Sequence, residues 1–242
     1  MLEIIDTHAH YDDARFDENR EAVIAGVLHT GYIRNIVNVG CDIASSKTSL
    51  ALAHKYPHFY AACGIHPHEC GKIADAKKTL AQLEELLSDK KCVALGEIGL
   101  DYHYDFSDRE IQKQWFEYQM QLAEKLDMPV VIHDREAHGD CMDIVRKYPN
   151  VRGEFHSFSG SAETAAELIK RGWYISFSGV ITFKNASKIL DVVKSVPPER
   201  IMIETDCPYL APVPMRGKDN NSSYLKYTAE AAGSVSQSPV CL

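Results

Sequence analysis

The sequence predicts an α/β protein of the (β/α)8 TIM-barrel class. Eight short apolar runs rich in β-branched residues alternate with longer amphipathic stretches, which is the pattern of parallel strands joined by helical crossovers. The chain has 242 residues, and such barrels use about 250 for one domain. We therefore expect a single domain over residues 1–242. The alternative is a doubly wound open sheet, but no glycine-rich nucleotide loop follows the first run.

The eight predicted strands are the apolar runs at 2–7, 35–39, 60–65, 92–98, 129–132, 152–155, 173–177 and 200–204. Three of the intervening stretches have apolar residues at three- and four-residue spacing, which predicts helices. These helices cover 74–89, 108–127 and 161–172. Gly172 closes the last of them and is expected to form its C-terminal cap.

Composition and charge limit the class of protein. The chain is 45% hydrophobic and 25% charged, with a net charge of −8, which argues against a broad basic face for duplex DNA. A phosphate substrate remains compatible, because metal ions would supply positive charge locally. The first residues carry no basic region typical of a signal peptide, and no apolar run approaches the ~20 residues of a membrane span. Seven cysteines without a Cys-x-x-Cys pair favour a reducing, cytoplasmic location.

Polar residues gather at the predicted strand ends, where a barrel places its active site. They are His8 and His10 (first strand), His66 and His68 (third), Glu97, Asp101, Tyr102 and His103 (fourth), His133 and Arg135 (fifth), His156 (sixth), and Glu204 and Asp206 (eighth). A single histidine at such a position is usually solvated or caps a strand. The joint pattern instead indicates a metal site, because imidazole and carboxylate bind zinc, manganese, iron or magnesium.

The first strand illustrates both interpretations. Asp6, His8 and His10 lie two residues apart in "EIIDTHAHYD" and so share one face of an extended strand. This alternation is also what a solvated strand face would show. Other histidines lie in or beside helical stretches: we interpret His29, His54 and His58 as surface residues, and His138 as a residue of a helix face.

Six motifs in chain order resemble the TatD family of metal-dependent deoxyribonucleases, which are amidohydrolase-like enzymes on a TIM barrel. The motifs are "DTHAH", "GIHPH", "GEIGLDY", "VIHDREA", "FHSFSG" and "ETDCPYLAPVPMRGK". Each is weak alone, but the ordered series runs from residue 4 to about residue 230. The resemblance implies a phosphodiester hydrolase with two divalent metal ions (Mg, Mn or Zn).

The same motif match implies individual roles. His8, His10 and Asp206 would hold one metal ion, His133 and His156 the other, and Glu97 would bridge the two. Asp206 would also accept a proton from the attacking water.

Five further residues have predicted roles around these ligands. His66 would donate to a phosphate oxygen, and Arg135 and Tyr102 are candidate substrate contacts that have salt-bridge or packing roles as alternatives. Asp6 and Glu204 would orient the imidazoles from behind.

The leading functional prediction is a 3′–5′ exonuclease that acts on single-stranded DNA ends, since a narrow barrel mouth favours a chain end. A second possibility is a metal-dependent amidase, esterase or lactonase, because the fold does not fix the substrate. A third is a metal-binding scaffold without turnover. The sequence indicates no membrane association and identifies no protein partner.

The C-terminal part departs from the family pattern. Where Asn-Glu-Pro usually precedes the last helix, this chain has Asn220, Asn221 and Ser222. The segment "GSVSQSPVCL" lacks a helical period. We therefore expect a shortened or altered C-terminal helical region with an atypical tail at 232–242, and an uncovered apolar patch beside the first and eighth strands.

Overall fold

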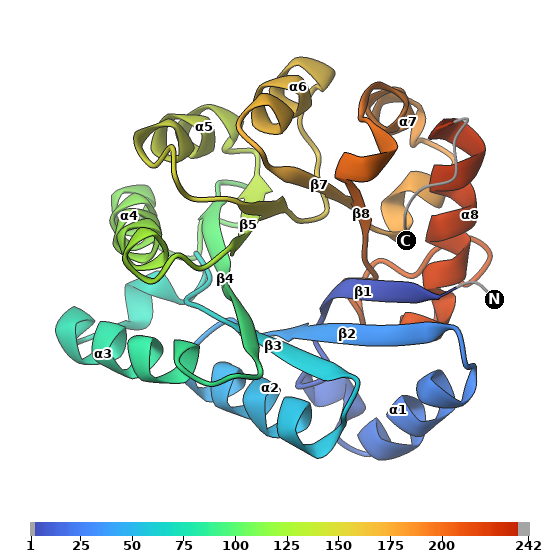
Figure 1. The fold of residues 1–242 in the computed structure, drawn as a ribbon, viewed down its shortest axis with the longest axis horizontal. Coiled ribbons are helices and arrows are strands. Elements are labelled where there is room, and N and C mark those ends of the chain that lie inside the picture. Colours follow the sequence, from blue (N-terminus) through green and yellow to red (C-terminus); the bar gives the residue numbers. More distant parts are fainter. Residues whose placement is uncertain (1–2, 237–242) are drawn as a thin grey trace. The chain divides into compact units, whose positions relative to one another are not determined.

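The computed structural model describes residues 3–236 and contains two compact units. The terminal unit combines the residues up to Asn38 with those from His156 onward, and the central unit is Val39–Phe155. Strands and helices alternate along the described chain (Figure 1). No helix in the described residues is long and apolar enough to cross a membrane.

The terminal unit holds four parallel strands. Its strands are β1 (Ile4–Ala9), β2 (Ile33–Val39, whose last residue belongs to the central unit), β7 (Tyr174–Phe177) and β8 (Ile201–Ile203). Its helices are α1 (Arg20–His29), α6 (Ala162–Lys170), α7 (Ser187–Ser195) and α8 (Leu225–Ser236), with single 3₁₀ turns η1 (Ala14–Phe16), η3 (Gly179–Thr182), η4 (Pro198–Arg200) and η5 (Ser222–Tyr224). β1 pairs with β2, β7 pairs with β8, and an isolated parallel bridge joins Ala9 to Cys207. The chain that follows β8 therefore lies against the end of β1.

Helix α8 covers part of this unit. It contacts β1, β8 and α7, and Leu225 and Ala232 are fully buried. The prediction that helical structure is absent from Gly233 onward is wrong for the first part of that segment, because α8 continues to Ser236. The expected tail residues 237–242 lie outside the described range. Among the described residues of β1 and β8, Ile5 is the one large apolar side chain that is exposed, at 37%.

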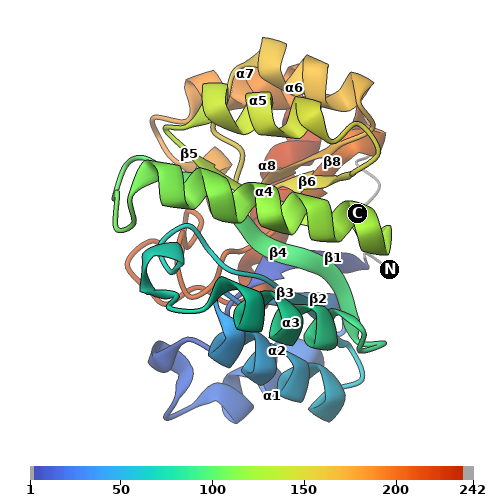
Figure 2. The same cartoon turned by 90° about the vertical axis from the view of Figure 1, so that its left-hand side faces the viewer.

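The central unit also holds four parallel strands with helices between them. Its strands are β3 (Phe59–Cys63), β4 (Cys92–Asp101), β5 (Val130–Arg135) and β6 (Gly153–Phe155). Its helices are α2 (Ile43–Lys55), α3 (Ala76–Leu87), α4 (Arg109–Leu126) and α5 (His138–Lys147), with a 3₁₀ turn η2 (Cys70–Lys72). β4 pairs with β3 on one side and with β5 on the other, and β5 pairs with β6. Figure 2 shows α3 and α4 running along these strands.

The predicted helices form for the expected reasons. Asp75, Asp108 and Ser161 each accept a backbone N–H of the first turn of α3, α4 and α6, which satisfies donors that a helix start leaves without partners. Along α4, Trp115, Phe116 and Met120 recur at helical spacing and are buried. Gly172 follows the last helical residues of α6 with φ +90°, the left-handed conformation of a C-terminal cap.

Three strands run past the ends that apolar patterning predicts. β1 includes His8, β4 reaches Asp101 instead of residue 98, and β5 reaches Arg135 instead of residue 132. The β4–β5 ladder continues through Gly99↔His133 and Asp101↔Arg135. Gly99 makes this possible, because it adopts φ +136° and a Cβ there would lie 2.0 Å from the carbonyl oxygen of His133.

Candidate metal and substrate site

Two histidines and a carboxylate converge in the terminal unit. The Nε2 atoms of His8 and His10 lie 3.0 Å apart, and Asp206 Oδ1 lies 3.8 Å from the first and 3.4 Å from the second. Backbone bonds hold them in register: the N–H of Asp206 donates to the carbonyl of His8, and the N–H of His10 donates to that of Cys207. Two imidazole nitrogens and a carboxylate oxygen aimed at one point form a donor set suited to a divalent transition metal.

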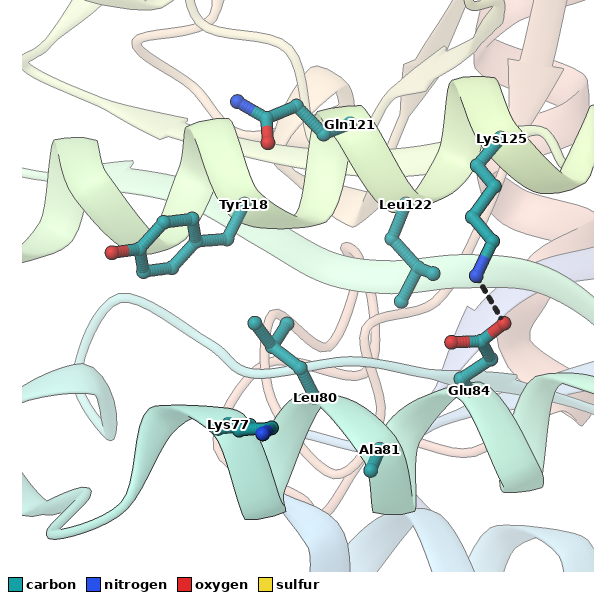
Figure 3. A pocket seen from close by; sticks show the side chains of 8 residues that line it. All are labelled: Lys77, Leu80, Ala81, Glu84, Tyr118, Gln121, Leu122 and Lys125. Atoms are coloured by element: carbon teal, nitrogen blue, oxygen red, sulfur yellow. Dashed lines mark hydrogen bonds and ion pairs between the residues drawn. The ribbon is translucent and has the colours of Figure 1, made fainter.

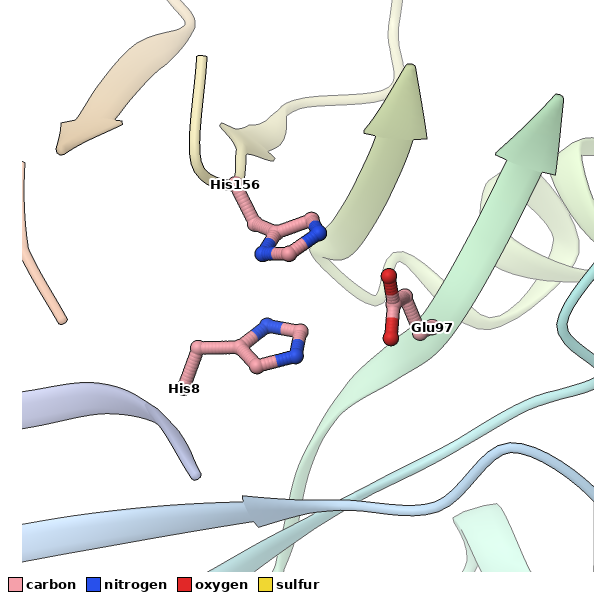
Figure 4. Close-up of side chains that lie close together, drawn as sticks. All are labelled: His8, Glu97 and His156. Atoms are coloured by element: carbon pink, nitrogen blue, oxygen red, sulfur yellow. The ribbon is translucent and has the colours of Figure 1, made fainter. Parts of the chain in front are cut away.

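His156 joins this group from the chain just after β6. Its ring stacks on that of His8 with centroids 4.0 Å apart and an interplanar angle of 18° (Figure 4). Its Nδ1 lies 3.0 Å from Glu204 Oε1, and the other oxygen of Glu204 accepts from the hydroxyl of Ser176. A carboxylate only accepts, so Nδ1 carries the proton and Nε2 keeps the lone pair that a metal needs. This contact is the one predicted for Glu204.

Asp6 has a different set of contacts from the predicted one. Its Oδ1 accepts the backbone N–H of Thr205 at 2.9 Å, and its Oδ2 accepts the hydroxyls of Thr205 and Ser222 at 2.6 Å each. It reaches His8 through the backbone N–H at 3.4 Å, so it positions the strand ends rather than the imidazole rings. Burial raises the pKa of Asp6 to about 6, although these hydrogen bonds act in the opposite direction.

A second group of titratable side chains lies in the central unit. Glu97, which projects from β4 (Figure 4), is 3% exposed. Its Oε1 lies 2.7 Å from His133 Nδ1 and 3.5 Å from His66 Nε2. On the other side of His133, Nε2 lies 3.0 Å from Asp101 Oδ2, and the same oxygen is 2.9 Å from His68 Nε2. His133 is thus held between two carboxylates, and Glu97, His66 and His133 form a second candidate cation site.

Hydrogen bonds define the protonation of His66. Its Nδ1 lies 3.1 Å from the backbone nitrogen of His68, whose N–H donates to it. The ring proton therefore sits on Nε2, which faces Glu97. Burial lowers the pKa of His66 to about 4, so the ring is neutral near pH 7. A neutral ring with its proton on Nε2 is a hydrogen-bond donor, and its donation to a phosphate oxygen stays a prediction.

The two candidate substrate contacts have different surroundings. The hydroxyl of Tyr102 donates to Asp140 Oδ2 at 2.6 Å, and the guanidinium carbon of Arg109 lies 4.2 Å from the Tyr102 ring centre. These are packing and structural contacts, one of the two alternatives left open for this residue. Arg135 is exposed and lies over the ring of Tyr104 at 4.8 Å.

Sequence reasoning missed several buried polar partners. Asp101 stands at a predicted strand end but received no role, although it accepts from His133 and His68. Thr205, Ser222 and Ser176 are buried hydroxyl residues that contact the carboxylates described above. Serine and threonine give little sign of a functional site in a sequence, because they are also common in turns. The histidines predicted to lie at the surface, His29, His54 and His58, are exposed.

The surface also has a hollow between α3 and α4, away from these groups. Its volume is about 330 Å³, and it is lined by side chains such as Leu80, Tyr118 and Leu122 (Figure 3). Glu84 and Lys125 close one end with an ion pair of 2.6 Å. The lining comes from helix faces and contains no histidine, so it does not resemble a metal site.

Comparison with known proteins identifies relatives over most of the chain. A family model described as "TatD related DNase" matches residues 5–240. The metal-dependent hydrolase YabD of Bacillus subtilis is 42% identical over 229 residues, which cover 94% of this chain and 89% of that protein. The metal-dependent hydrolase YcfH of Escherichia coli K12 is 34% identical over 232 residues, with 94% and 86% covered.

Solved structures agree with these sequence matches. The TatD homologue YjjV of Escherichia coli superimposes with a TM-score of 0.90 at 30% identity, covering 98% of this chain and 92% of that one. A TIM-barrel protein of Bordetella bronchiseptica matches with a TM-score of 0.65 at 15% identity over 99% of this chain and 96% of that one, which concerns the fold alone. The (β/α)8 TIM-barrel class predicted from the sequence is confirmed.

Proposed function

Because this chain belongs to the family of TatD-related DNases and is a metal-dependent hydrolase, we propose that it hydrolyses the phosphodiester bonds of DNA. In this proposal it removes nucleotides from single-stranded 3′ ends. The observation that carries it is the convergence of His8, His10 and Asp206. Uncoordinated imidazoles seldom bring two nitrogens to 3.0 Å beside a carboxylate unless they share a proton or a cation.

We assign one divalent ion to His8, His10 and Asp206, and a second to the pair of Glu97 and His133. The Nε2 lone pair of His156 supports its role as a ligand. The shared use of Glu97 by both ions, which the motif match implies, stays a prediction. The imidazole-rich set in the terminal unit favours zinc or manganese, whereas the second pair, with the carboxylate of Glu97 beside one imidazole, also suits magnesium.

Each side chain has a defined task in the reaction. When bound, two divalent ions polarise the phosphodiester and lower the pKa of the attacking water. His66 donates its Nε2 proton to a phosphate oxygen. Asp206 accepts the proton of the water. Burial raises the pKa of Asp206, but the hydrogen bond from His10 and the neighbouring imidazoles outweigh it and keep the pKa below its usual range, so the acceptor is ionised near pH 7.

The test is hydrolysis of a 5′-labelled single-stranded oligonucleotide in magnesium or manganese. We expect a ladder that shortens from the 3′ end and disappears with EDTA and in Glu97→Ala. The exposed Glu85 offers a matched control, and Glu85→Ala should retain full activity. Both variants should keep the far-ultraviolet spectrum of the parent.

Three outcomes would contradict parts of the proposal. Turnover by Glu97→Ala at the parental rate would remove Glu97 from the reaction. A ladder that shortens from the 5′ end would reverse the polarity. A cooperatively melting protein that retains metal but cleaves no oligonucleotide would leave small amides, esters and lactones to be tested, and failure on those would favour a metal-binding scaffold.

A further inference from the structure

An aromatic platform stands out on the loop after β4. We use this name for Tyr104 and Phe106, which are 48% and 68% exposed. Their rings stack with centroids 5.3 Å apart and an interplanar angle of 21°. Phe106 is the most exposed of the large apolar side chains in the described part of the chain. Leaving such a ring in water forgoes about 1.5–3 kcal/mol of burial energy, so its exposure requires an explanation.

The loop that carries the platform is firmly held. Asp101 Oδ1 accepts the backbone N–H groups of His103 and Tyr104 at 3.0 and 2.9 Å. Asp105 lies between Tyr104 and Phe106 in the sequence and has φ +51°, and its carboxylate accepts two hydrogen bonds from Arg109.

The other end of the loop is fixed as well. The hydroxyl of Ser107 accepts the N–H of Gly71 at 2.9 Å and donates to the carbonyl of His68. Hydrogen bonds therefore hold the loop on both sides of Phe106, and a side chain carried by a fixed loop loses less entropy when it binds a partner.

The platform adjoins the group of titratable residues in the central unit. The ring of His68 makes edge contacts with Tyr104 at 5.5 Å and with Phe106 at 4.8 Å. The same ring lies 4.4 Å from that of His66, and its Nε2 is 2.9 Å from Asp101. The ring of His68 thus separates the exposed rings from His66, the proposed phosphate donor.

A cation accompanies the rings. The guanidinium of Arg135 lies 4.8 Å from the centre of the Tyr104 ring, and among residues 3–236 it forms no ion pair with a carboxylate. It is therefore available to a phosphate, which guanidinium binds through two parallel hydrogen bonds.

We propose that the aromatic platform stacks a nucleobase of the single-stranded substrate while Arg135 contacts an adjoining phosphate. This inference rests on the proposed function and specifies its substrate: a strand with unpaired bases. The net charge of −8 argues against a long basic groove, so stacking supplies affinity that phosphate contacts do not. Stacking on an aromatic ring contributes about 1–3 kcal/mol for each base and is tolerant of sequence.

The experiment compares two substrates and three variants. One oligonucleotide is ordinary single-stranded DNA, and the other has the same backbone with abasic sites throughout. Phe106→Ala removes the outer ring, and Phe106→Trp preserves a stacking face. Ile111→Ala, which truncates another exposed apolar residue at 39% exposure, is the matched control. Each protein is assayed with its metal for kcat/KM on both substrates.

We expect Phe106→Ala to lower kcat/KM on the ordinary strand by about 5- to 150-fold, the range that the stacking of one base implies. The abasic strand should be cleaved at the same rate by the parent and by Phe106→Ala. Phe106→Trp should retain the preference for bases, and Ile111→Ala should behave as the parent. An equal loss on both substrates, or no loss on either, would overturn the proposal.

Failure of the proposed function can be told apart from failure of this inference. If the parent cleaves neither strand, fluorescence anisotropy with the labelled ordinary and abasic strands still measures binding. Tighter binding of the ordinary strand that Phe106→Ala abolishes would support the platform without nuclease activity. Equal binding of both strands, together with self-association that Phe106→Ala abolishes in sedimentation, would overturn it in favour of contact between copies of this chain.

Discussion

Asp6→Asn separates the charge of this buried carboxyl from its hydrogen bonds. Asp6 is fully buried and accepts from the backbone of Thr205 and from the hydroxyls of Thr205 and Ser222. Asparagine has the same shape, and its carbonyl oxygen still accepts the N–H of Thr205. Its amide donates to the hydroxyls, which rotate to accept. The substitution therefore removes the titrating proton. It keeps the volume of the side chain and leaves its hydrogen-bonding groups with partners.

The magnitude follows from the pKa. Burial raises the pKa of Asp6 to about 6 from 3.8, so the folded protein binds this proton more tightly than the unfolded chain does. The carboxyl thus contributes stability that is fully present below pH 3.8 and is lost as the pH rises through about 6. At 1.36 kcal/mol for each pH unit, the full loss is about 3 kcal/mol, of which about 2 kcal/mol falls between pH 4.5 and 7.5.

The assay is urea unfolding of both proteins between pH 4.5 and 7.5, with EDTA present because a bound cation near His8 would itself lower the pKa. The free energy of unfolding of the parent should fall by about 2 kcal/mol relative to Asp6→Asn across this range. Asp191→Asn, at a side chain 73% exposed, should show no such trend. A difference between parent and Asp6→Asn that stays constant within about 0.5 kcal/mol would refute the reasoning.

Two further predictions concern the hydrogen bond that orients His156 and the packing of the hydrophobic core. Glu204→Gln weakens the acceptor that holds His156 Nδ1, so the metal concentration for half-maximal hydrolysis should rise about 10- to 100-fold; an unchanged value would show that this hydrogen bond does not support metal binding. Phe116→Ala empties a fully buried position on α4 and should lower the free energy of unfolding by about 3–5 kcal/mol in urea, whereas a loss under about 1 kcal/mol would show that the site collapses to fill the cavity.

Apolar patterning located the strands but misplaced the ends that matter for the site. It stops β5 at residue 132, whereas the ladder continues through His133 and Arg135. The pattern reports which side chains are buried in the core, and a strand end that faces a polar site has lost that signal while its backbone still pairs. The resemblance to a family supplies His133 and Glu97 as candidates, but it says nothing of Asp101, whose contacts depend on the close approach of β4 and β5 at Gly99.

The altered segment before the last helix shows another limit of sequence reasoning. Asn220, Asn221 and Ser222 depart from the family pattern, which leaves the start of this helix undefined in the sequence. In the structure, Asn220 donates to the carbonyls of Thr205 and Tyr209, Asn221 caps η5, and Ser222 donates to Asp6. The partner of Ser222 lies 216 positions away and those of Asn220 lie in the preceding loop, and such pairings are not readable from local propensity.

The contacts of Asp6 also set the order in which the protein can be assembled. Its partners Thr205 and Ser222 lie 199 and 216 residues later in the chain. At synthesis rates of about 5–20 residues per second, His8 and His10 wait roughly 10–40 s for Asp206 to be made. During that time the two imidazoles have neither their carboxylate nor the strand end that positions it. A cation is therefore captured late in synthesis, and a nascent chain that stalls before Thr205 leaves the ribosome without this binding site.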